Sequence, residues 1–444
     1  MSRCRVVLLS FGLVLAACGD GAPGTSSATG AATVRDSAGI RIVENHDSAW
    51  TEETRWRLPD EPDFVIGSLD GSVPGTDWGN MLQVQAMGDR VVVSDLMDVG
   101  FRVFDDTGTW VETLGRRGQG PLELQNAVSW TTVGDSLLAS DGRKVVVFEQ
   151  GSGEASSYPT EDPPVETETW SIGGIEIGWI TYGWFGDGSY VLANTPDPRD
   201  REPGYTTLGA EFHRMSPGGA YLGPLGVHAI GRVFTRADGE TAPIPFMTMP
   251  HIAVSDRKLW HAFADSLFEF RRIDATSGQV DLLVRIADRG QRVTDEMTAR
   301  MHALEDEQIS TLMEEMGGGG DAATMQRMRS TMDEMRESQP DPRWAPTIFG
   351  LDPLDSGHIL VGLPDWSWRL LPNQLLLGNV PSDESVAFAV FDADGRWLGT
   401  LEGPPGLVVT DVSDDYLVGY RRDEFDVPYI ERWGLIKPGS SASR

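Results

Sequence analysis

Polar and apolar positions follow one recurring pattern along the chain, a short polar turn followed by a run of apolar residues. Aspartate, glycine or serine occupies the turn, and β-branched or aromatic residues dominate the run. These residue types favour turns and packed strands respectively. The pattern occurs six times, with turns that begin at Gly88, Gly134, Asp187, Ser255, Asp355 and Ser413. We therefore expect six tight turns, each leading into a strand.

A second pattern follows the first in most copies and predicts that each unit closes with a hairpin. Residues 103–114 match residues 390–401 without a gap, since both carry Val-Phe-Asp, then glycine, tryptophan and Thr-Leu. A shorter match begins at Met215, and looser versions occur at 147–153 and 273–278. In each copy a strand ends in a turn with aspartate or glycine, and a second strand begins.

Two hairpins per unit make a four-stranded antiparallel sheet, and repeated sheets in a ring make a propeller. The sequence therefore predicts an all-β chain, a six-bladed β-propeller over residues 37–437. A sandwich or an eight-stranded barrel is the competing fold, but neither predicts the same order of turns and strands six times. The last unit is one strand short, whereas residues 39–43 and 64–67 resemble strands without an opening turn. We expect an N-terminal strand to complete the sixth blade.

The repeat is interrupted between the fourth and fifth copies, where about residues 293–337 show a helical pattern. Thr294 opens the first expected helix, Gly317 ends it, and Pro340 ends the second helix. Methionine recurs on one face of the second helix, at Met325, Met328, Met332 and Met335. We expect this α-helical hairpin to pack its methionines on the propeller or on itself. A copper(I) site and an adaptable surface for a partner are the alternatives.

The N-terminus has the features of an export signal. Residues 1–17 carry two arginines and then an apolar run that is too short for an ordinary membrane span. The run ends in Leu-Ala-Ala-Cys, which resembles the bacterial lipobox, so we expect Cys18 to be lipidated and to become the new N-terminus. A plain signal peptide is the alternative. Residues 18–36 are small and polar, as in a flexible linker, and residues 438–444 are expected to form a disordered tail.

Composition narrows the partners and the compartment. The chain has 67 acidic and 36 basic residues, a net charge of −31, which makes a nucleic-acid partner unfavourable. Cys4 leaves with the signal, so no disulfide framework is expected. A globular body held by a lipid anchor to a bacterial membrane, on the extracytoplasmic side of the cell envelope, fits these features. The oligomeric state stays open.

Several segments together resemble a known family, the six-bladed β-propeller lipoproteins of bacteria, which are related to NHL-repeat propellers. The resemblance lies in SAGIRIVEN after the lipobox, VVVSD, RVFDDTG, TLGRRGQGP, VFDADGRWLGTL and DDYLVGYRRDEFDVPYIERWGL. The family commonly continues the glycine-rich run with Gly-Glu-Phe, where this chain has Leu122-Glu123-Leu124. The resemblance implies a propeller fold. NHL-type propellers often bind proteins, whereas the six-bladed gluconolactonases are metal-dependent hydrolases, so fold alone does not choose between these activities.

Candidate site residues are few, and no catalytic residue is assigned. The common metal and nucleophile motifs, such as His-Glu-x-x-His and Gly-x-Ser-x-Gly, are absent from the sequence. Residues 115–121, GRRGQGP, first suggest an anion-binding loop, but the gapless copy keeps the glycine and proline character and loses both arginines. Turn chemistry therefore explains the loop, apart from its arginines. The possible ligand contacts are Arg116, Arg117, His261, Trp366 and Trp368, and a core position is the simpler interpretation of His261.

The leading functional hypothesis is a non-catalytic binding or scaffold module for a protein, a peptide or a glycan. It needs no cofactor. The alternative is a metal-dependent hydrolase of the lactonase type, with calcium or zinc on the propeller axis. Its candidate ligands are carboxylates and amides at corresponding strand ends, although the repeat explains them equally well: Asp95, Asp141 and Asn194.

Overall fold

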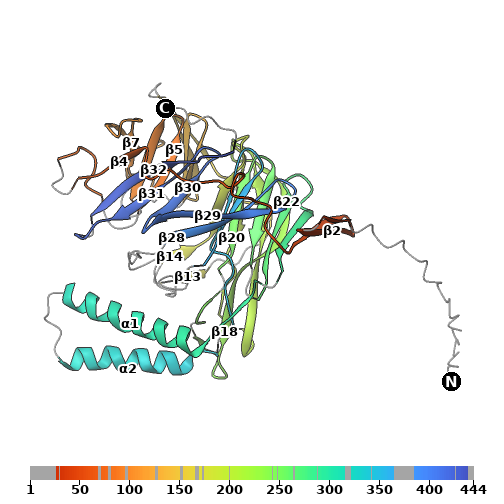
Figure 1. Ribbon diagram of the computed structural model, residues 1–444. Coiled ribbons are helices and arrows are strands. Elements are labelled where there is room, and N and C mark those ends of the chain that lie inside the picture. Colours follow the sequence, from red (N-terminus) through yellow and green to blue (C-terminus); the bar gives the residue numbers. More distant parts are fainter. Residues whose placement is uncertain are drawn as a thin grey trace, which may run out of the picture.

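Most of the chain is β-strand in the computed structural model (Figure 1). It describes residues 27–29, 31–68, 72–78, 82–95, 99–125, 129–150, 154–165, 170–172, 175–199, 201–242, 244–247, 249–263, 266–287, 289–315, 322–341, 343–364, 385–425 and 427–438. The predicted class, all-β with repeated four-stranded antiparallel sheets, is confirmed.

Sheets 1 to 3, numbered in chain order, occupy the N-terminal half. Sheet 1 contains β5 (Leu82–Met87), β6 (Arg90–Asp95), β7 (Phe101–Phe104) and β8 (Trp110–Leu114). Sheet 2 contains β9 (Ser129–Val133), β10 (Ser136–Ser140), β11 (Lys144–Glu149) and β12 (Ala155–Pro159). Sheet 3 contains β15 (Trp179–Trp184), β16 (Tyr190–Asn194), β17 (Gly204–Met215), β18 (Tyr221–Thr235) and β19 (Thr241–Ala242). A separate pair, β13 (Trp170–Ile172) and β14 (Ile175–Ile177), precedes sheet 3.

Sheets 4 to 6 follow, and two of them recruit N-terminal strands. Sheet 4 contains β20 (His251–Ser255), β21 (Lys258–Ala262), β22 (Phe268–Asp274) and β23 (Val280–Ile286), then β3 (Ile40–Asn45), β2 (Ala32–Ser37) and β1 (Ser27–Thr29). Sheet 5 contains β26 (Gly350–Pro353), β27 (Ile359–Gly362), β28 (Ser385–Phe391) and β29 (Trp397–Pro405). Sheet 6 contains β30 (Val408–Val412), β31 (Tyr416–Arg422), β32 (Pro428–Gly434) and β4 (Phe64–Ile66).

The six sequence repeats mark the same place in each sheet. Every predicted turn joins the first strand of a sheet to its second strand. Gly88 and Gly134 take the left-handed backbone conformation there, with φ of 62° and 58°. Asp256 does so without being glycine, at φ 44°, which aspartate tolerates better than most residues. The polar turns and apolar runs of the sequence therefore correspond to real turns and buried second strands.

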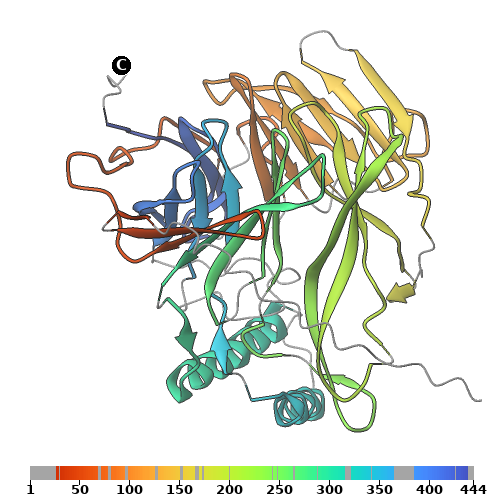
Figure 2. The ribbon, with the colours of Figure 1, turned by 90° about the vertical axis from the view of Figure 1, so that its right-hand side faces the viewer.

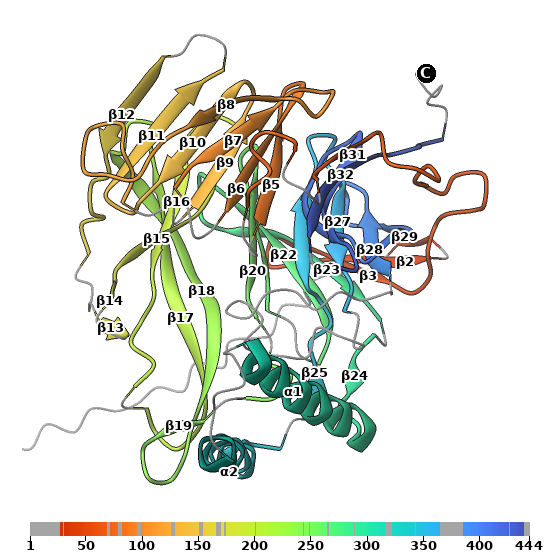
Figure 3. The ribbon, with the colours of Figure 1, turned by 90° about the vertical axis from the view of Figure 1, so that its left-hand side faces the viewer.

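Apolar side chains form a core between each sheet and the next. Phe101 and Trp130, for example, join sheets 1 and 2, with ring centroids 5.4 Å apart. Corresponding clusters join sheets 2 and 3, 3 and 4, 4 and 5, and 5 and 6. A further cluster contains Val84 of sheet 1 and Val418 of sheet 6. It joins the last sheet to the first, so the sheets close on one another, and Figure 3 shows sheets 1 and 2 beside each other above the long strands of sheet 3.

The two expected N-terminal strands lie in different sheets. β4 pairs with β32, with Ile66 opposite Ile430, and so gives sheet 6 its fourth strand. β3 instead runs parallel to β23, with Val43 opposite Val284. Asn45, at the end of β3, is fully buried and hydrogen-bonds to sheet 5: its Nδ2 donates to the Gly395 carbonyl at 3.0 Å, and its Oδ1 accepts from the Trp397 amide at 2.8 Å.

Two helices, α1 (Asp295–Glu315) and α2 (Ala322–Ser338), stand between β24 (Gln291–Arg292) and β25 (Trp344–Ala345), which pair with each other. They lie at the end of the molecule toward which β17 and β18 extend (Figure 2).

Side-chain contacts hold the two helices to each other and to the sheets. Arg336 of α2 pairs with Glu305 and Asp306 of α1, at 3.0 and 2.9 Å. Met301 of α1 is buried against Phe246 and Ala345. The side chains of Met325, Met328 and Met332 lie outside the described part, so the expected methionine face stays a prediction. Neither helix, in the part of the chain that the structure describes, is long and apolar enough to cross a membrane.

Candidate functional site

The first strands of the sheets face one another on the inside of the assembly. β5 contacts β9, β9 contacts β15, β15 contacts β20, β20 contacts β26, and β30 contacts β5. We call these six strands the axial strands. All residues of β20 and β30 are partly accessible, whereas the second strands are mostly buried. The axial strands therefore carry the side chains that solvent can reach from inside the ring of sheets.

Neighbouring axial strands are joined by side chains. Thr410 of β30 donates its hydroxyl to the Val84 carbonyl at 2.9 Å. The Asp411 carboxylate accepts the Ala86 amide at 3.0 Å, and on the other side Thr132 of β9 donates to the Ala86 carbonyl at 2.6 Å. The inner edge of β5 would otherwise present unpaired backbone groups. The threonines and Asp411 thus stabilise the assembly by satisfying them.

A bulge in β30 allows Thr410 and Asp411 to reach β5 together. Val409 pairs with Gly419 and Asp411 pairs with Val418, so Thr410 is the extra residue. Alternation along a regular strand would send these two side chains to opposite faces. A Cβ on Gly419 would lie 2.1 Å from the Val408 carbonyl oxygen, so the close approach of the strands requires glycine there. Bulges commonly redirect side chains beside functional sites.

Asp352 of β26 and Asp411 of β30 form a pair of deeply set carboxyls, which we call the axial carboxyl pair. Burial, and secondarily the charge of Asp411, raises the pKa of Asp352 to about 7. Burial raises the pKa of Asp411 to about 6, against hydrogen bonds from Ala86, Val412 and Tyr416 that lower it. Both side chains are nonetheless partly accessible. Protein atoms crowd the two carboxyls, although each residue keeps some accessible surface.

The two carboxyls differ in their partners. Asp411 has the Ala86 amide and therefore a structural role. The Asp352 carboxyl has no hydrogen-bond partner among the described residues. A carboxyl with a pKa near neutrality both donates and accepts hydrogen bonds at physiological pH, because its acid and its anion coexist. Perturbed carboxyls of this kind are concentrated at functional sites, and Asp352 can meet an amine, a guanidinium or a hydroxyl group.

A calcium or zinc ion of the lactonase type fits this place poorly. Catalytic zinc sites use three protein ligands, and calcium takes six to eight oxygens. Within the described residues no three histidine, cysteine, aspartate or glutamate side chains are grouped to hold a metal ion. The axial carboxyl pair supplies two carboxyls, one of which already accepts the Ala86 amide. We derive no metal-dependent step from it.

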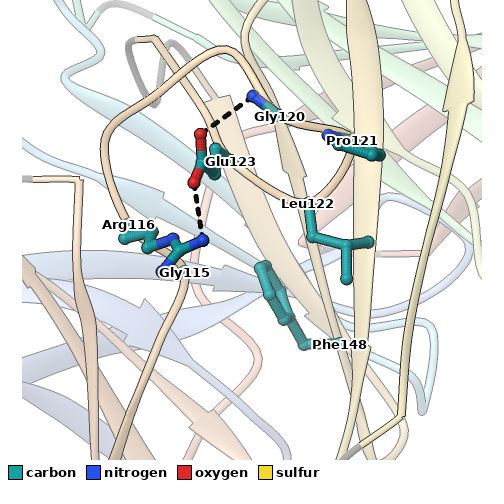
Figure 4. Close-up of a pocket in the computed structure, with 7 residues that line it drawn as sticks. All are labelled: Gly115, Arg116, Gly120, Pro121, Leu122, Glu123 and Phe148. Atoms are coloured by element: carbon teal, nitrogen blue, oxygen red, sulfur yellow. Dashed lines mark hydrogen bonds and ion pairs between the residues drawn. The ribbon is translucent and has the colours of Figure 1, made fainter.

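The glycine-rich loop, residues 115–121, contacts a carboxylate of the same chain, that of Glu123 (Figure 4). The Glu123 carboxylate accepts the Gly120 amide at 2.9 Å and pairs with Arg116 at 2.7 Å. The Gly120 amide is the largest influence that lowers the pKa of Glu123, followed by the Arg116 charge. Arg117 donates to the Gln125 carbonyl at 3.1 Å. A ligand contact by either arginine stays a prediction, because the internal carboxylate already occupies the position of an external anion.

Leu122, Phe148 and the loop line a hollow of about 390 Å³. Gly118 lies under the Glu123 carboxylate, where a Cβ would come within 2.0 Å of Oε2. Glycine at this position therefore leaves room for the carboxylate, which a larger residue would displace.

His261 is a buried, hydrogen-bonded histidine on β21, the second strand of sheet 4. Its Nε2 lies 2.7 Å from the Ala229 carbonyl, and Arg271 donates to Nδ1 at 3.2 Å. Burial, followed by the Arg271 charge, lowers the pKa of His261 to about 3. The ring is neutral, with the proton on Nε2, and links sheets 3 and 4. These contacts support the structural interpretation, while a ligand contact by His261 stays a prediction.

The other residues singled out in the sequence lie in or after the second strands of their sheets or outside the described part. Asp95 ends β6, Asn194 ends β16, and Asp141 follows β10, all in or after second strands. Asp141 accepts the amides of the turn that it opens. The sequence positions that fall outside the described residues are Cys18, Trp366 and Trp368.

The sequence did contain a signal for the axial carboxyl pair. Asp352 lies three positions before the turn at Asp355, and Asp411 lies two positions before the turn at Ser413. An acidic residue in a first strand is therefore visible from the repeat alone. Which of the two stays unpartnered depends on the bulge in β30, which the repeat does not show.

No protein-family model and no curated protein matches the chain. Among solved structures, a candidate exported protein from Bacteroides fragilis is similar over 89% of this chain and 99% of its own, at 11% identity and a TM-score of 0.42. A DUF4221-family member from Bacteroides vulgatus covers 87% and 100%, at 9% identity and a TM-score of 0.46. The WD40 domain of Neurospora crassa Pan2 covers 89% and 99%, at 8% identity and a TM-score of 0.36. Similarity at this level assigns no activity to the chain.

Proposed function

We propose that the chain is an extracytoplasmic, lipid-anchored binding or scaffold module, built as a six-bladed β-propeller with an inserted helical hairpin. Six sheets of four or more strands and the cluster between sheets 6 and 1 support the blade number in the described residues. The lipobox-like segment that ends at Cys18 supports export and anchoring. Protein, peptide and glycan ligands are the classes that such a module would take.

One observation supports the binding function: the Asp352 carboxyl on an axial strand has no hydrogen-bond partner among the described residues. A buried polar group without a partner costs free energy, which a ligand can recover by supplying the missing hydrogen bond. The suitable ligand group is a cationic amine or guanidinium, or the hydroxyls of a sugar. Nucleic acid is disfavoured by the net charge of −31.

The test is a screen of the purified full-length chain on glycan and cationic peptide arrays, with a matched pair of variants. Asp352→Asn removes the ionisable carboxyl, and Asp355→Asn changes an exposed aspartate in the neighbouring turn. We expect ligands that bind the wild type and Asp355→Asn but not Asp352→Asn. Equal binding by all three proteins would refute an axial site.

The alternative function, a metal-dependent hydrolase of the lactonase type, draws support only from the axial position of two carboxyls. Elemental analysis of the chain together with turnover of a lactone panel tests it. Near-stoichiometric calcium or zinc with turnover that Asp352→Asn abolishes would favour the hydrolase. A metal-free chain that is inert on the panel would reject it.

A further inference from the structure

Arg289 has no carboxylate partner among the residues that the structure describes, unlike its neighbour Arg285. Its guanidinium lies over the rings of Phe268 and Trp397, 5.8 and 5.6 Å from their centroids. Its Nη1 is buried and makes no hydrogen bond within the described structure. Arg285, four positions earlier, pairs with Glu269 at 2.6 Å. Arg289 is therefore a partly buried cation that packs against two rings and has no anionic partner in the part of the chain that the structure describes.

Burial lowers the pKa of the Arg289 guanidinium. Guanidinium stays protonated in proteins, so the charge persists and its desolvation is left uncompensated. Stacking on aromatic rings satisfies the flat faces of the group but not the N–H donors at its edge. Those donors match the two oxygens of a carboxylate, which they bind side by side.

Arg289 lines a pocket of about 410 Å³ together with residues of sheet 5. The size is that of a small-molecule site. Its polar lining consists of Arg289, Gln291, Thr347, Thr400 and Glu402. The apolar remainder is Pro346, Leu363, Pro364 and Ala387. Thr400 and Glu402 belong to β29, the last strand of sheet 5, so this pocket is separate from the axial strands.

The pocket has one cationic and one anionic side chain, and they do not pair with each other. The guanidinium of Arg289 lies over the two rings, and within the described residues neither Arg289 nor Glu402 takes part in an ion pair. A lining with one charge of each sign disfavours a phosphate or another dianion, which Glu402 would repel. It matches a ligand that itself carries one charge of each sign.

We propose that the Arg289 pocket binds a small zwitterion of the amino-acid or short-peptide class, with the ligand carboxylate on Arg289 and its ammonium group toward Glu402. The Gln291 amide and the threonine hydroxyls supply further hydrogen bonds to the ligand backbone. This site is independent of the axial carboxyl pair, so either assignment can fail without the other.

The experiment is a calorimetric titration of the full-length chain with the dipeptide Ala-Ala, its C-terminal amide and its N-acetyl form. We expect the dipeptide to bind, and amidation to weaken binding by about tenfold or more, which corresponds to about 1.4 kcal/mol. Acetylation should weaken binding less, because Glu402 is exposed. Inorganic phosphate serves as the competing probe, and phosphate binding tighter than that of the dipeptide would overturn the proposal.

Matched variants locate the binding. Arg289→Met keeps an unbranched stem against the two rings and removes the guanidinium, so we expect binding of the dipeptide to be lost. Arg292→Met is the control, since Arg292 stacks on Trp344 at 4.5 Å and does not line the pocket. Glu402→Gln should weaken binding of the dipeptide but not of its acetylated form.

Some outcomes would place the ligand elsewhere or exclude it. Undiminished binding by Arg289→Met would refute the site, as would the absence of dipeptide binding to the wild type at millimolar concentration. If Arg289→Met fails to melt cooperatively, the comparison of free and amidated dipeptides on the wild type still decides. Loss of dipeptide binding in Asp352→Asn but not in Arg289→Met would place the ligand on the axial strands and overturn this proposal.

Discussion

Ionisation of Asp352 works against folding. Its pKa is raised from an ordinary 3.8 to about 7, so the native state holds this proton where the unfolded chain has released it. The contribution of the Asp352 proton to the free energy of unfolding is fully present below pH 4 and is lost as the pH rises toward 7. Asparagine has nearly the same shape and does not ionise. Asp352→Asn should therefore be more stable than the wild type at pH 8, by on the order of 2–4 kcal/mol.

Chemical denaturation at pH 4 and pH 8 measures this effect. The gap between Asp352→Asn and the wild type should nearly vanish at pH 4, where both side chains are neutral. Asp355→Asn, in the exposed turn, should show no such gap at either pH. A variant that is less stable than the wild type at pH 8 would show that the ionised carboxylate is compensated in the native state.

The contacts that single residues make were harder to predict from the sequence than the strands or the sheets. The continuation of the gapless copy at residues 402–406 assigned the glycines of the loop to turn chemistry, but it left Arg116 unexplained. Its partner Glu123 lies seven positions away, beyond the residues that the repeat matches. The Arg289 pocket likewise combines side chains from β24, β28 and β29 with residues of the segments that follow β23, β25 and β27, which no local pattern links.

At the level of elements, β4 is a short strand, and one of its side chains accounts for most of its contribution to stability. Ile66 is 1% exposed and belongs to the core between sheets 6 and 1, whereas its neighbour Val65 is 51% exposed. Truncating a buried isoleucine to alanine costs about 2–5 kcal/mol, because contacts are lost and a cavity remains. Ile66→Ala should lower the unfolding free energy by this amount, and Val65→Ala should change it by less than about 0.5 kcal/mol.

Equilibrium denaturation of the two variants tests the role of β4 in joining sheets 6 and 1. Similar losses for Ile66→Ala and Val65→Ala would mean that β4 acts through its backbone pairing alone. An unchanged free energy of unfolding in both variants would mean that sheet 6 is stable without its fourth strand.

The segment that contains the two helices leaves the sheets after β24 and returns at β25, and these two short strands pair with each other. Arg292 of β24 pairs with Trp344 of β25, so the chain returns to the point where it left. A short glycine-containing turn can replace residues 295–341 without opening a gap. We expect the shortened chain to keep a single cooperative melt, with a modest loss because Met301 no longer covers Phe246 and Ala345. Loss of cooperativity in calorimetry would show that the helices belong to the folding core.

Patterns within one element were predictable, and pairings between distant elements were only partly so. Thr294 does open α1, since its hydroxyl accepts the Met297 amide at 3.2 Å. An N-terminal strand does complete sheet 6. The parallel pairing of β3 with β23 has no counterpart in the repeat, because it depends on Asn45 fitting between sheets 4 and 5. The bulge at Thr410 is likewise invisible in a strand of alternating residues.

For the whole molecule, the order of sheets was the most predictable feature, because one repeat produces every sheet. Each unit presents apolar residues on both faces of its second strand, as in Leu137-Leu138-Ala139, and can bury both only between two neighbours. A linear row would leave the outer faces of its first and last sheets exposed. The cluster of Val84 and Val418 avoids that exposure, and closure is thus a consequence of the same pattern that identifies the strands.

The attachment of the whole molecule to a membrane should depend on lipid and not on charge. A body with a net charge of −31 is repelled by anionic lipid headgroups, so it gains nothing from the electrostatic attraction that assists basic proteins. Cys18→Ala should therefore move the chain from the membrane to the soluble fraction, as measured by fractionation and immunoblotting. Cys4→Ala, within the expected signal peptide, is the matched control and should stay membrane-bound. Retention of Cys18→Ala in the membrane fraction after a high-salt wash would contradict lipidation at this residue, since salt screens charge but leaves an acyl anchor in place.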